Sequence, residues 1–269
     1  MAAESILANF FSVADLRRPG ALRALGAEFD RHALLRPARV DNKDPARQKV
    51  DSAADAMGEG EPRLDPNRWQ WWFYSRPGAP QLSGTLQVEK ADEVHDLGFS
   101  WRPAEWFDRP ERLDTLFDVV AAVGDAMGAL YGRAALGLMY TQRNNALDRT
   151  RREPGKFGAR LQPDLGRELP DVYWLNYFGP GLVQHWGGRL DTLGVKRLHT
   201  PGGAVLVQAT ETPFVHDPAM KPISAYPFKQ PFYEALGFDT FMSETQSRGE
   251  PGQHVPAIEV HRKIAAERG

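Results

Sequence analysis

Alternating hydrophobic and polar residues predict an antiparallel hairpin in the first third of the chain. Trp69–Tyr74 and residues 81–89 both alternate with period 2, which is the pattern of a strand with one buried face. Between them, Ser-Arg-Pro-Gly-Ala-Pro supplies residues that favour turns. The alternation returns over residues 97–101 and predicts a third strand after the hairpin.

Hydrophobic residues at helical spacing predict two helices, over residues 21–35 and 109–131. We expect Asp108 to cap the longer helix and Gly132 to end it. The apolar residues 134–140 then predict a buried strand. The residues that we expect to be buried are Leu113, Phe117, Val120, Met127, Trp174, Leu175 and Val207.

The C-terminal part of the chain mixes short strands and short helices. Gly179-Pro180-Gly181 breaks a predicted strand and begins a helix that runs through Trp186. Thr200-Pro201-Gly202-Gly203 provides the turn between two further strands. The predicted strands cover residues 171–178, 195–199 and 204–208, and another short helix covers residues 232–236.

Two irregular segments interrupt these elements. Residues 41–66 are rich in Asp, Glu, Gly and Pro, so we expect mostly a long solvated connection there, in which only residues 53–57 favour a helix. Residues 143–167 are rich in arginine and predict a second connection. The predicted fold is α+β, with mainly antiparallel strands covered by helices. The chain then forms either one compact domain or an N-terminal half (1–142), a connection (143–170) and a C-terminal half (171–269).

The composition is that of an ordinary globular protein. The 269 residues are 42% hydrophobic and 25% charged, and the net charge of −2 excludes the basic footprint of a dedicated nucleic-acid binder. The absence of cysteine excludes disulfides, thiolate metal sites and cysteine nucleophiles. Asp125 and Arg133 interrupt the longest apolar stretch, so no membrane span is expected. The first residues do not resemble a secretory signal, and the cytoplasm is therefore the expected location.

The familiar catalytic and phosphate-binding motifs are absent, so we expect no enzymatic activity, no cofactor and no essential metal. The alternative is a hydrolase that uses His95, Asp96, His216 and Asp217 as metal ligands or as an acid and base. Each His-Asp pair follows a valine, which suggests two related α+β halves as a further hypothesis. Packed histidines are the favoured interpretation.

Trp69, Trp71 and Trp72 suggest a third class of function, a platform that binds carbohydrate or peptide. In a strand, however, Trp69 and Trp71 share one face with Phe73. Core packing is therefore the favoured interpretation of this hairpin.

A long motif lies between Tyr173 and Val183, with the sequence Tyr-Trp-Leu-Asn-Tyr-Phe-Gly-Pro-Gly-Leu-Val, and Trp186-Gly187-Gly188 follows it. It resembles the Trp-Leu-Asn-aromatic-x-Gly-Pro-x-Leu-Val pattern of a bacterial family of type VI secretion system immunity proteins, the TsiV-like proteins. Downstream, Gly202-Gly203, Thr212-Pro213 and Asp217 follow the order found in that family. The resemblance in sequence covers residues 171–217, and the resemblance in layout covers most of the chain.

This resemblance implies an α+β protein that binds and neutralises a toxic effector, encoded by an adjacent gene, rather than an enzyme. It implies a protein partner, with no direct binding to nucleic acid or membrane. A monomer and a homo-oligomer are both compatible with the sequence. The motif itself also suits a buried scaffold, so it carries no catalytic residues over to this chain.

Charge suggests where such a partner would bind. Residues 1–140 hold 21 acidic and 17 basic residues, and several of the acids are concentrated between positions 51 and 65. A toxin that acts on nucleic acids or nucleotides needs a basic cleft, which carboxylates can block. The expected toxin-binding residues are Asp51, Asp55, Glu59, Glu61 and Asp65, and the alternative is a solvated loop with no partner.

Overall fold

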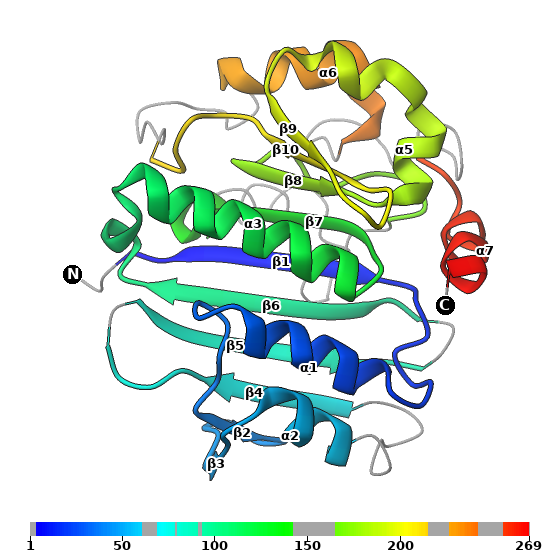
Figure 1. The fold of residues 1–269 in the computed structure, drawn as a ribbon. Coiled ribbons are helices and arrows are strands. Elements are labelled where there is room, and N and C mark those ends of the chain that lie inside the picture. The colour runs from blue at the N-terminus through cyan, green and yellow to red at the C-terminus, as the bar shows by residue number, and fades with distance from the viewer. Residues whose placement is uncertain are drawn as a thin grey trace, which may run out of the picture.

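The computed structural model describes residues 4–60, 69–78, 80–90, 93–141, 165–214, 226–241 and 255–268. Over these residues, ten strands form one sheet in the order β3-β2-β4-β5-β6-β1-β7-β8-β10-β9, and all neighbouring strands are antiparallel (Figure 1). The expected α+β class with mainly antiparallel strands is confirmed. Strands from both predicted halves of the chain share this sheet.

The strands vary in length from two to eight residues. In chain order they are β1 (Ile6–Ser12), β2 (Arg39–Asp41), β3 (Gln48–Lys49), β4 (Trp69–Tyr74), β5 (Gln81–Val88), β6 (His95–Arg102), β7 (Ala129–Leu136), β8 (Leu175–Phe178), β9 (Lys196–His199) and β10 (Val205–Gln208). The main helices are α1 (Ala21–Arg31), α2 (Ala53–Gly60), α3 (Pro110–Ala126), α5 (Pro180–Trp186), α6 (Gln230–Leu236) and α7 (Ile258–Arg268).

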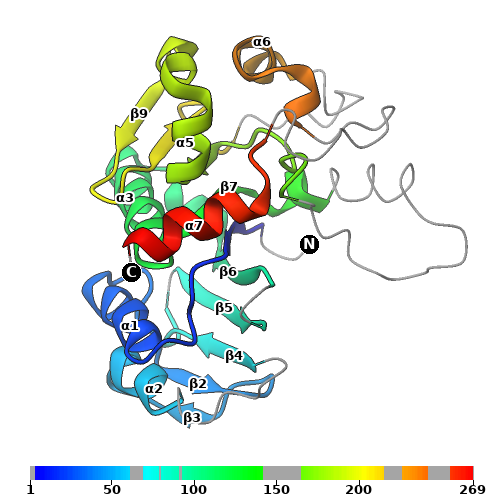
Figure 2. The same cartoon turned by 90° about the vertical axis from the view of Figure 1, so that its right-hand side faces the viewer.

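One layer of helices covers one face of the sheet. Figures 1 and 2 show α1, α2 and α3 side by side on the same face. Beneath them, Phe10, Phe29, Phe73, Phe99 and Trp101 form a chain of ring contacts with centroid distances between 5.3 and 6.2 Å. Their burial removes a large apolar area from water and ties the helices to the sheet.

A second hydrophobic cluster lies on the other face, at the C-terminal strands. It includes Tyr131 and Phe178 from the sheet, Trp186 from α5, and Phe232 and Leu236 from α6. The rings of Phe178 and Trp186 meet edge to face, with centroids 5.2 Å apart. The sheet is therefore covered by α1–α3 on one face and by short C-terminal elements on part of the other.

Most of the predicted elements are confirmed. The hairpin is β4–β5, the third strand is β6, and β9 pairs with β10 across the predicted turn. The residues expected in the core are all buried, with at most 8% of their surface exposed. The predicted connection at 143–167 lies almost entirely outside the described residues, and the division into halves stays a prediction.

The predicted boundary between the long helix and the next strand is wrong. Helix α3 ends at Ala126, and Gly128 adopts a left-handed backbone with φ of +57°, which turns the chain into β7 at Ala129. The predicted strand at 134–140 likewise ends early, and residues 137–141 are helical. Met127 and Leu130 continue the helical hydrophobic spacing, so the sequence pattern does not distinguish a buried helix from a buried strand here.

Two further predictions are corrected. Asp108 does not cap α3, because Arg109 occupies that position and makes no side-chain hydrogen bond to the helix. Residues 41–60 are not a loose connection, since β3 pairs with β2 and α2 packs on α1. Tertiary contacts thus order a segment whose composition favours a loop.

The Gly-Pro motif is anchored to α3 through Tyr177. The Tyr177 hydroxyl donates to Asp125 Oδ1 at 2.8 Å, and its ring lies directly against Gly124. Asp125 also accepts hydrogen bonds from the Thr200 hydroxyl and the Gly202 amide, at 2.6 and 2.8 Å. One carboxylate therefore joins α3, β8 and the β9–β10 turn.

Gly124→Ala tests this packing. A methyl group at this position would overlap the buried Tyr177 ring, so we expect the free energy of unfolding to fall by about 1–3 kcal/mol. The control is Gly58→Ala in α2, where a methyl group meets only the movable end of the Arg23 side chain and should cause little change. Urea denaturation measures both variants. A Gly124→Ala protein as stable as the wild type would contradict the packing described.

Candidate functional site

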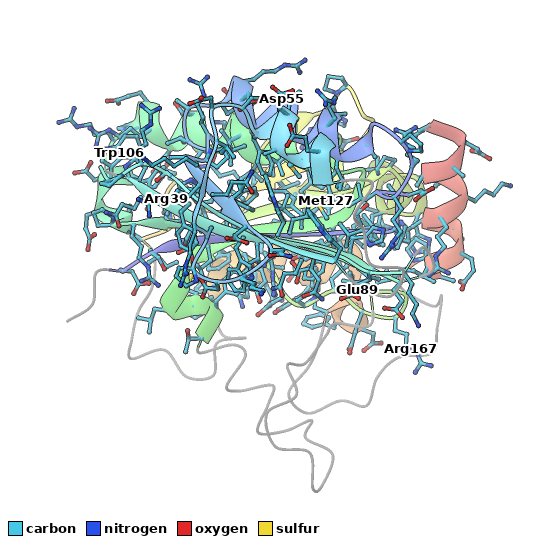
Figure 3. All side chains as sticks on the ribbon, turned by 90° about the horizontal axis from the view of Figure 1, so that it is seen from below. Arg39, Asp55, Glu89, Trp106, Met127 and Arg167 are labelled. Atoms are coloured by element: carbon cyan, nitrogen blue, oxygen red, sulfur yellow. The ribbon has the colours of Figure 1, made fainter. Side chains whose placement is uncertain are left out.

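Two of the five acids expected to bind a toxin, Asp55 and Glu59, lie on α2, and a third, Asp51, lies two residues before the helix begins. All three are exposed, and a spacing of four residues places Asp55 and Glu59 on the same side of the helix. The residues on its inner side, Ala53 and Met57, are fully buried. Figure 3 shows Asp55 on the helix-covered side of the sheet. We call Asp51, Asp55 and Glu59 the α2 acidic face.

Helix α2 is held in place by a carboxylate from α1. Asp30 accepts hydrogen bonds from the Ala53 and Ala54 amides, at 2.8 and 3.1 Å, and from the Ser52 hydroxyl at 2.9 Å. These bonds satisfy amides at the start of a helix, which have no partner within the helix itself. This contact is not apparent from the sequence, because the capping residue precedes the helix by more than twenty positions.

Among the described residues, one of the three acids of the α2 acidic face has an ion-pair partner. Asp55 forms an ion pair with Arg23 at 2.8 Å, but both side chains are more than half exposed, so water and salt weaken the pair. Among the described residues, Asp51 and Glu59 form no ion pair. The other two predicted acids, Glu61 and Asp65, lie outside the described residues.

A cleft of about 460 Å³ opens beside this face. Leu34, Val50 and Trp106 provide apolar surface, while Arg36, Arg76 and Asp51 provide charge. This volume lies within the range typical of small ligand sites, and it also suits a side chain inserted by a protein partner. The cleft combines segments that are distant in sequence, so it is not apparent from the sequence alone. Asp51 is the one residue of its lining that was expected at a binding site.

The His-Asp pair that the hydrolase alternative requires is not brought together. His95 is fully buried and faces the helix layer, whereas its neighbour Asp96 is on the opposite face of β6. Burial lowers the pKa of His95 to about 4, and the charge of Arg17 contributes. Its Nδ1 accepts a hydrogen bond from the Glu89 amide at 3.1 Å. His95 is thus a packed neutral histidine.

The second pair, His216 and Asp217, lies outside the described residues, so the structure does not test it or the proposed relation between the halves. Within the described ranges, no three His, Asp or Glu side chains are placed to hold a metal ion. No helix in those ranges has the length and hydrophobicity needed to cross a membrane.

The tryptophan hairpin is divided between the core and the opposite sheet face. Trp69 and Trp71 are at most 9% exposed, and their rings are stacked with centroids 6.2 Å apart. Trp72 is half-buried on the other face. Two of the three rings are therefore core residues, as the alternation with Phe73 predicts.

A buried ion pair, which the sequence does not reveal, joins two segments near the C-terminal strands. Lys229 donates to Asp171 Oδ2 at 2.6 Å, and both side chains are almost completely buried. Asp171 Oδ1 also accepts from the Tyr233 hydroxyl, at 3.1 Å. A buried pair of this kind is destabilising to break, so it joins the segment before β8 to the start of α6.

The architecture defines a class: an α+β protein with a ten-stranded antiparallel sheet and a helix layer on one face. No protein-family model matches the chain, and no curated protein matches it. A solved structure that is similar to it is the "T6SS protein PA0821" of Pseudomonas aeruginosa, where T6SS denotes the type VI secretion system. The TM-score is 0.59 with 15% sequence identity, and the match covers 97% of this chain and 81% of that chain. The two proteins share a fold.

The buried histidines predict how stability depends on pH. Burial lowers the pKa of both His95 and His261 to about 4, below the ordinary value of 6.5 that applies in the unfolded chain. Between pH 6.5 and 4 the unfolded state therefore binds more protons than the folded state. The free energy of unfolding consequently decreases as the pH is lowered through this range. For His95 alone the loss by pH 5 should be about 1–2 kcal/mol.

His95→Asn removes this titration while Asn Oδ1 replaces Nδ1 as acceptor for the Glu89 amide. We expect the fall in melting temperature between pH 7 and pH 5 to be several degrees smaller in this variant than in the wild type. Thermal denaturation at a series of pH values measures the difference. An identical fall in both proteins would show that His95 is already charged in the folded state.

Proposed function

We propose that this protein is an immunity protein that binds and neutralises a cognate type VI secretion effector. The observation that carries the proposal is its fold similarity to a T6SS protein, which extends along 97% of the chain. The resemblance of residues 173–188 to the motif of TsiV-like immunity proteins supports the same assignment independently. In the structure this motif forms β8 and α5, where it acts as scaffold.

We further propose that the effector acts in the cytoplasm on nucleic acids or nucleotides. Enzymes that act on these polyanions present positively charged clefts. The α2 acidic face is exposed, two of its three acids form no ion pair with the residues that the structure describes, and Asp51 also lines a cleft that suits an inserted side chain. Carboxylates on this protein would accelerate its encounter with a basic cleft on the toxin. They would also compete with the polyanionic substrate for that cleft.

Coexpression tests the proposed role. Production of the toxin from the adjacent gene should stop growth of a bacterial host, and coproduction of this protein should restore growth. The protein should also retain an affinity-tagged toxin through purification. A toxin with an inactivated catalytic site serves as the binding control, since it should bind equally well. Normal toxicity in the presence of soluble, folded protein would contradict the immunity role.

Charge reversal tests the proposed binding face. We expect Asp51→Lys, Asp55→Lys and Glu59→Lys together to slow association with the toxin about 10–100-fold at low salt. The effect should shrink as salt screens the charges. The matched control reverses three exposed acids elsewhere, Glu211, Glu259 and Glu267, with the same change in net charge.

Surface plasmon resonance at several salt concentrations measures both triple variants. The melting temperature of each should change little, because all six side chains are exposed. Equal slowing in the two variants would show that total charge matters and not this face. An unchanged association rate in the α2 variant would remove the face from the binding surface.

A further inference from the structure

Arg133 is a buried cation in the middle of the sheet. It lies on β7, opposite Asn9 of β1 and Asn176 of β8, and only 7% of its surface is exposed. Its neighbour Gly132 packs against Phe10 beneath the helix layer, so Arg133 lies on the face away from α1 and α3. This face is visible in Figure 2 as the side of the sheet opposite those helices.

Two stacked tyrosines hold the guanidinium group. Its carbon lies 4.3 Å from the ring centre of Tyr140 and 4.9 Å from that of Tyr173, and the two rings are 5.1 Å apart. Arg133 Nη1 donates a hydrogen bond to the Tyr173 hydroxyl at 2.8 Å. Burial alone would lower the pKa of Arg133, but the surrounding tyrosines and Asp96 raise it above its ordinary value. The group is therefore fixed in position and charged.

No carboxylate of the described residues lies within ion-pair distance of this charge, and Asp96 acts on it only from further away. The buried Lys229 differs, because it meets the Asp171 carboxylate at 2.6 Å. A buried charge without such a partner is costly, so a position like that of Arg133 is unusual in a folded chain.

Two hydrogen-bond donors at this position are also unused. Arg133 Nε and the Tyr140 hydroxyl are both buried, and neither has a hydrogen-bond partner with ordinary bonding geometry, although the hydroxyl lies close enough to Arg133 for the guanidinium to act against the rise of its pKa. Burial raises the pKa of Tyr140, so its hydroxyl stays protonated and keeps a proton to donate. Unused buried donors of this kind destabilise a protein unless a ligand satisfies them.

We propose that Arg133 and Tyr140 form a binding site for an organic carboxylate. Because Nη1 is occupied by Tyr173, the Nε–Nη2 edge of the guanidinium is the one available, and it matches the two oxygens of a carboxylate. The Tyr140 hydroxyl supplies a further donor. A single positive charge near the negative Asp96 suits a monoanion better than phosphate.

The carboxylate could belong to a free organic acid or to an acidic side chain of a protein. The proposal holds whether or not the chain is an immunity protein, since it depends only on the chemistry around Arg133. Two probes separate the sources: propionate represents a free acid, and the α-amide of N-acetylglutamate represents a side chain with its backbone. Phosphate and sulfate at the same ionic strength are the comparison anions.

Thermal denaturation of the full chain with increasing concentrations of each probe measures binding. We expect at least one carboxylate to raise the melting temperature by about 5–10 °C at 100 times its dissociation constant, with a further rise in proportion to the logarithm of its concentration. Tyr140→Phe should weaken this affinity roughly tenfold. Arg133→Met should abolish it, and the control Arg102→Met, which removes an exposed arginine, should leave it unchanged.

The stability of the free variants distinguishes a binding role from a structural one. Tyr140→Phe removes an oxygen that makes no hydrogen bond of ordinary geometry, so without ligand it should melt at the wild-type temperature or above. This variant decides the question even if Arg133→Met does not fold. Binding of only the glutamate amide would assign the site to a protein side chain. Failure of both carboxylates to bind, a stronger effect of phosphate or sulfate, or undiminished binding by Tyr140→Phe would overturn the proposal.

Discussion

The pairing of β1 with β6 on one side and β7 on the other holds the whole sheet together. The first strand of the chain lies between β6 and β7, which come about 90 and 120 residues later in the sequence, and both neighbours run antiparallel to it. Strands β6 and β7 are therefore parallel to each other, and α3 crosses over β1 to connect them. This crossover places α3 beside α1 on one face of the sheet, and α2 follows because it packs on α1.

The two faces of the sheet consequently have different chemistry. On the helix-covered face, aromatic side chains fill the core, and the outer surface of α2 presents carboxylates to solvent. On the other face, the register of β1 and β7 brings Arg133 beside Asn9, among tyrosines that hold it without neutralising it. The immunity role that we propose uses the first face, and the carboxylate site lies on the second.

How much could be predicted from the sequence depends on how local each determinant is. The period-2 alternation of β4 and β5 needs only neighbouring residues, so the hairpin was predictable in both extent and burial. The end of α3 was not, because the hydrophobic spacing continues past Gly128. Residues 53–57 were recognisable as helix-prone, but the place of α2 in the fold was not, because its N-terminus is held by Asp30, which lies on another helix.

The sites follow the same rule. The acids of α2 were visible as a concentration of charge, but their common orientation required the helix. In the sequence, Arg133 stands out as a charged residue within an apolar segment. Such a residue is often buried at a functional site, but the sequence does not show which groups surround it. The surroundings of Arg133 are formed by segments some forty residues apart, as the hydrogen bond to Tyr173 shows. The sequence therefore does not reveal that no carboxylate of the described residues pairs with it.

The central claim is that this fold serves to bind an effector, and calorimetry with purified components tests it most directly. The protein would be titrated with a catalytically inactive form of the effector from the adjacent gene. The account predicts saturable binding with a dissociation constant below about 1 µM that weakens as salt is raised. No binding at micromolar concentrations of two folded proteins would contradict it.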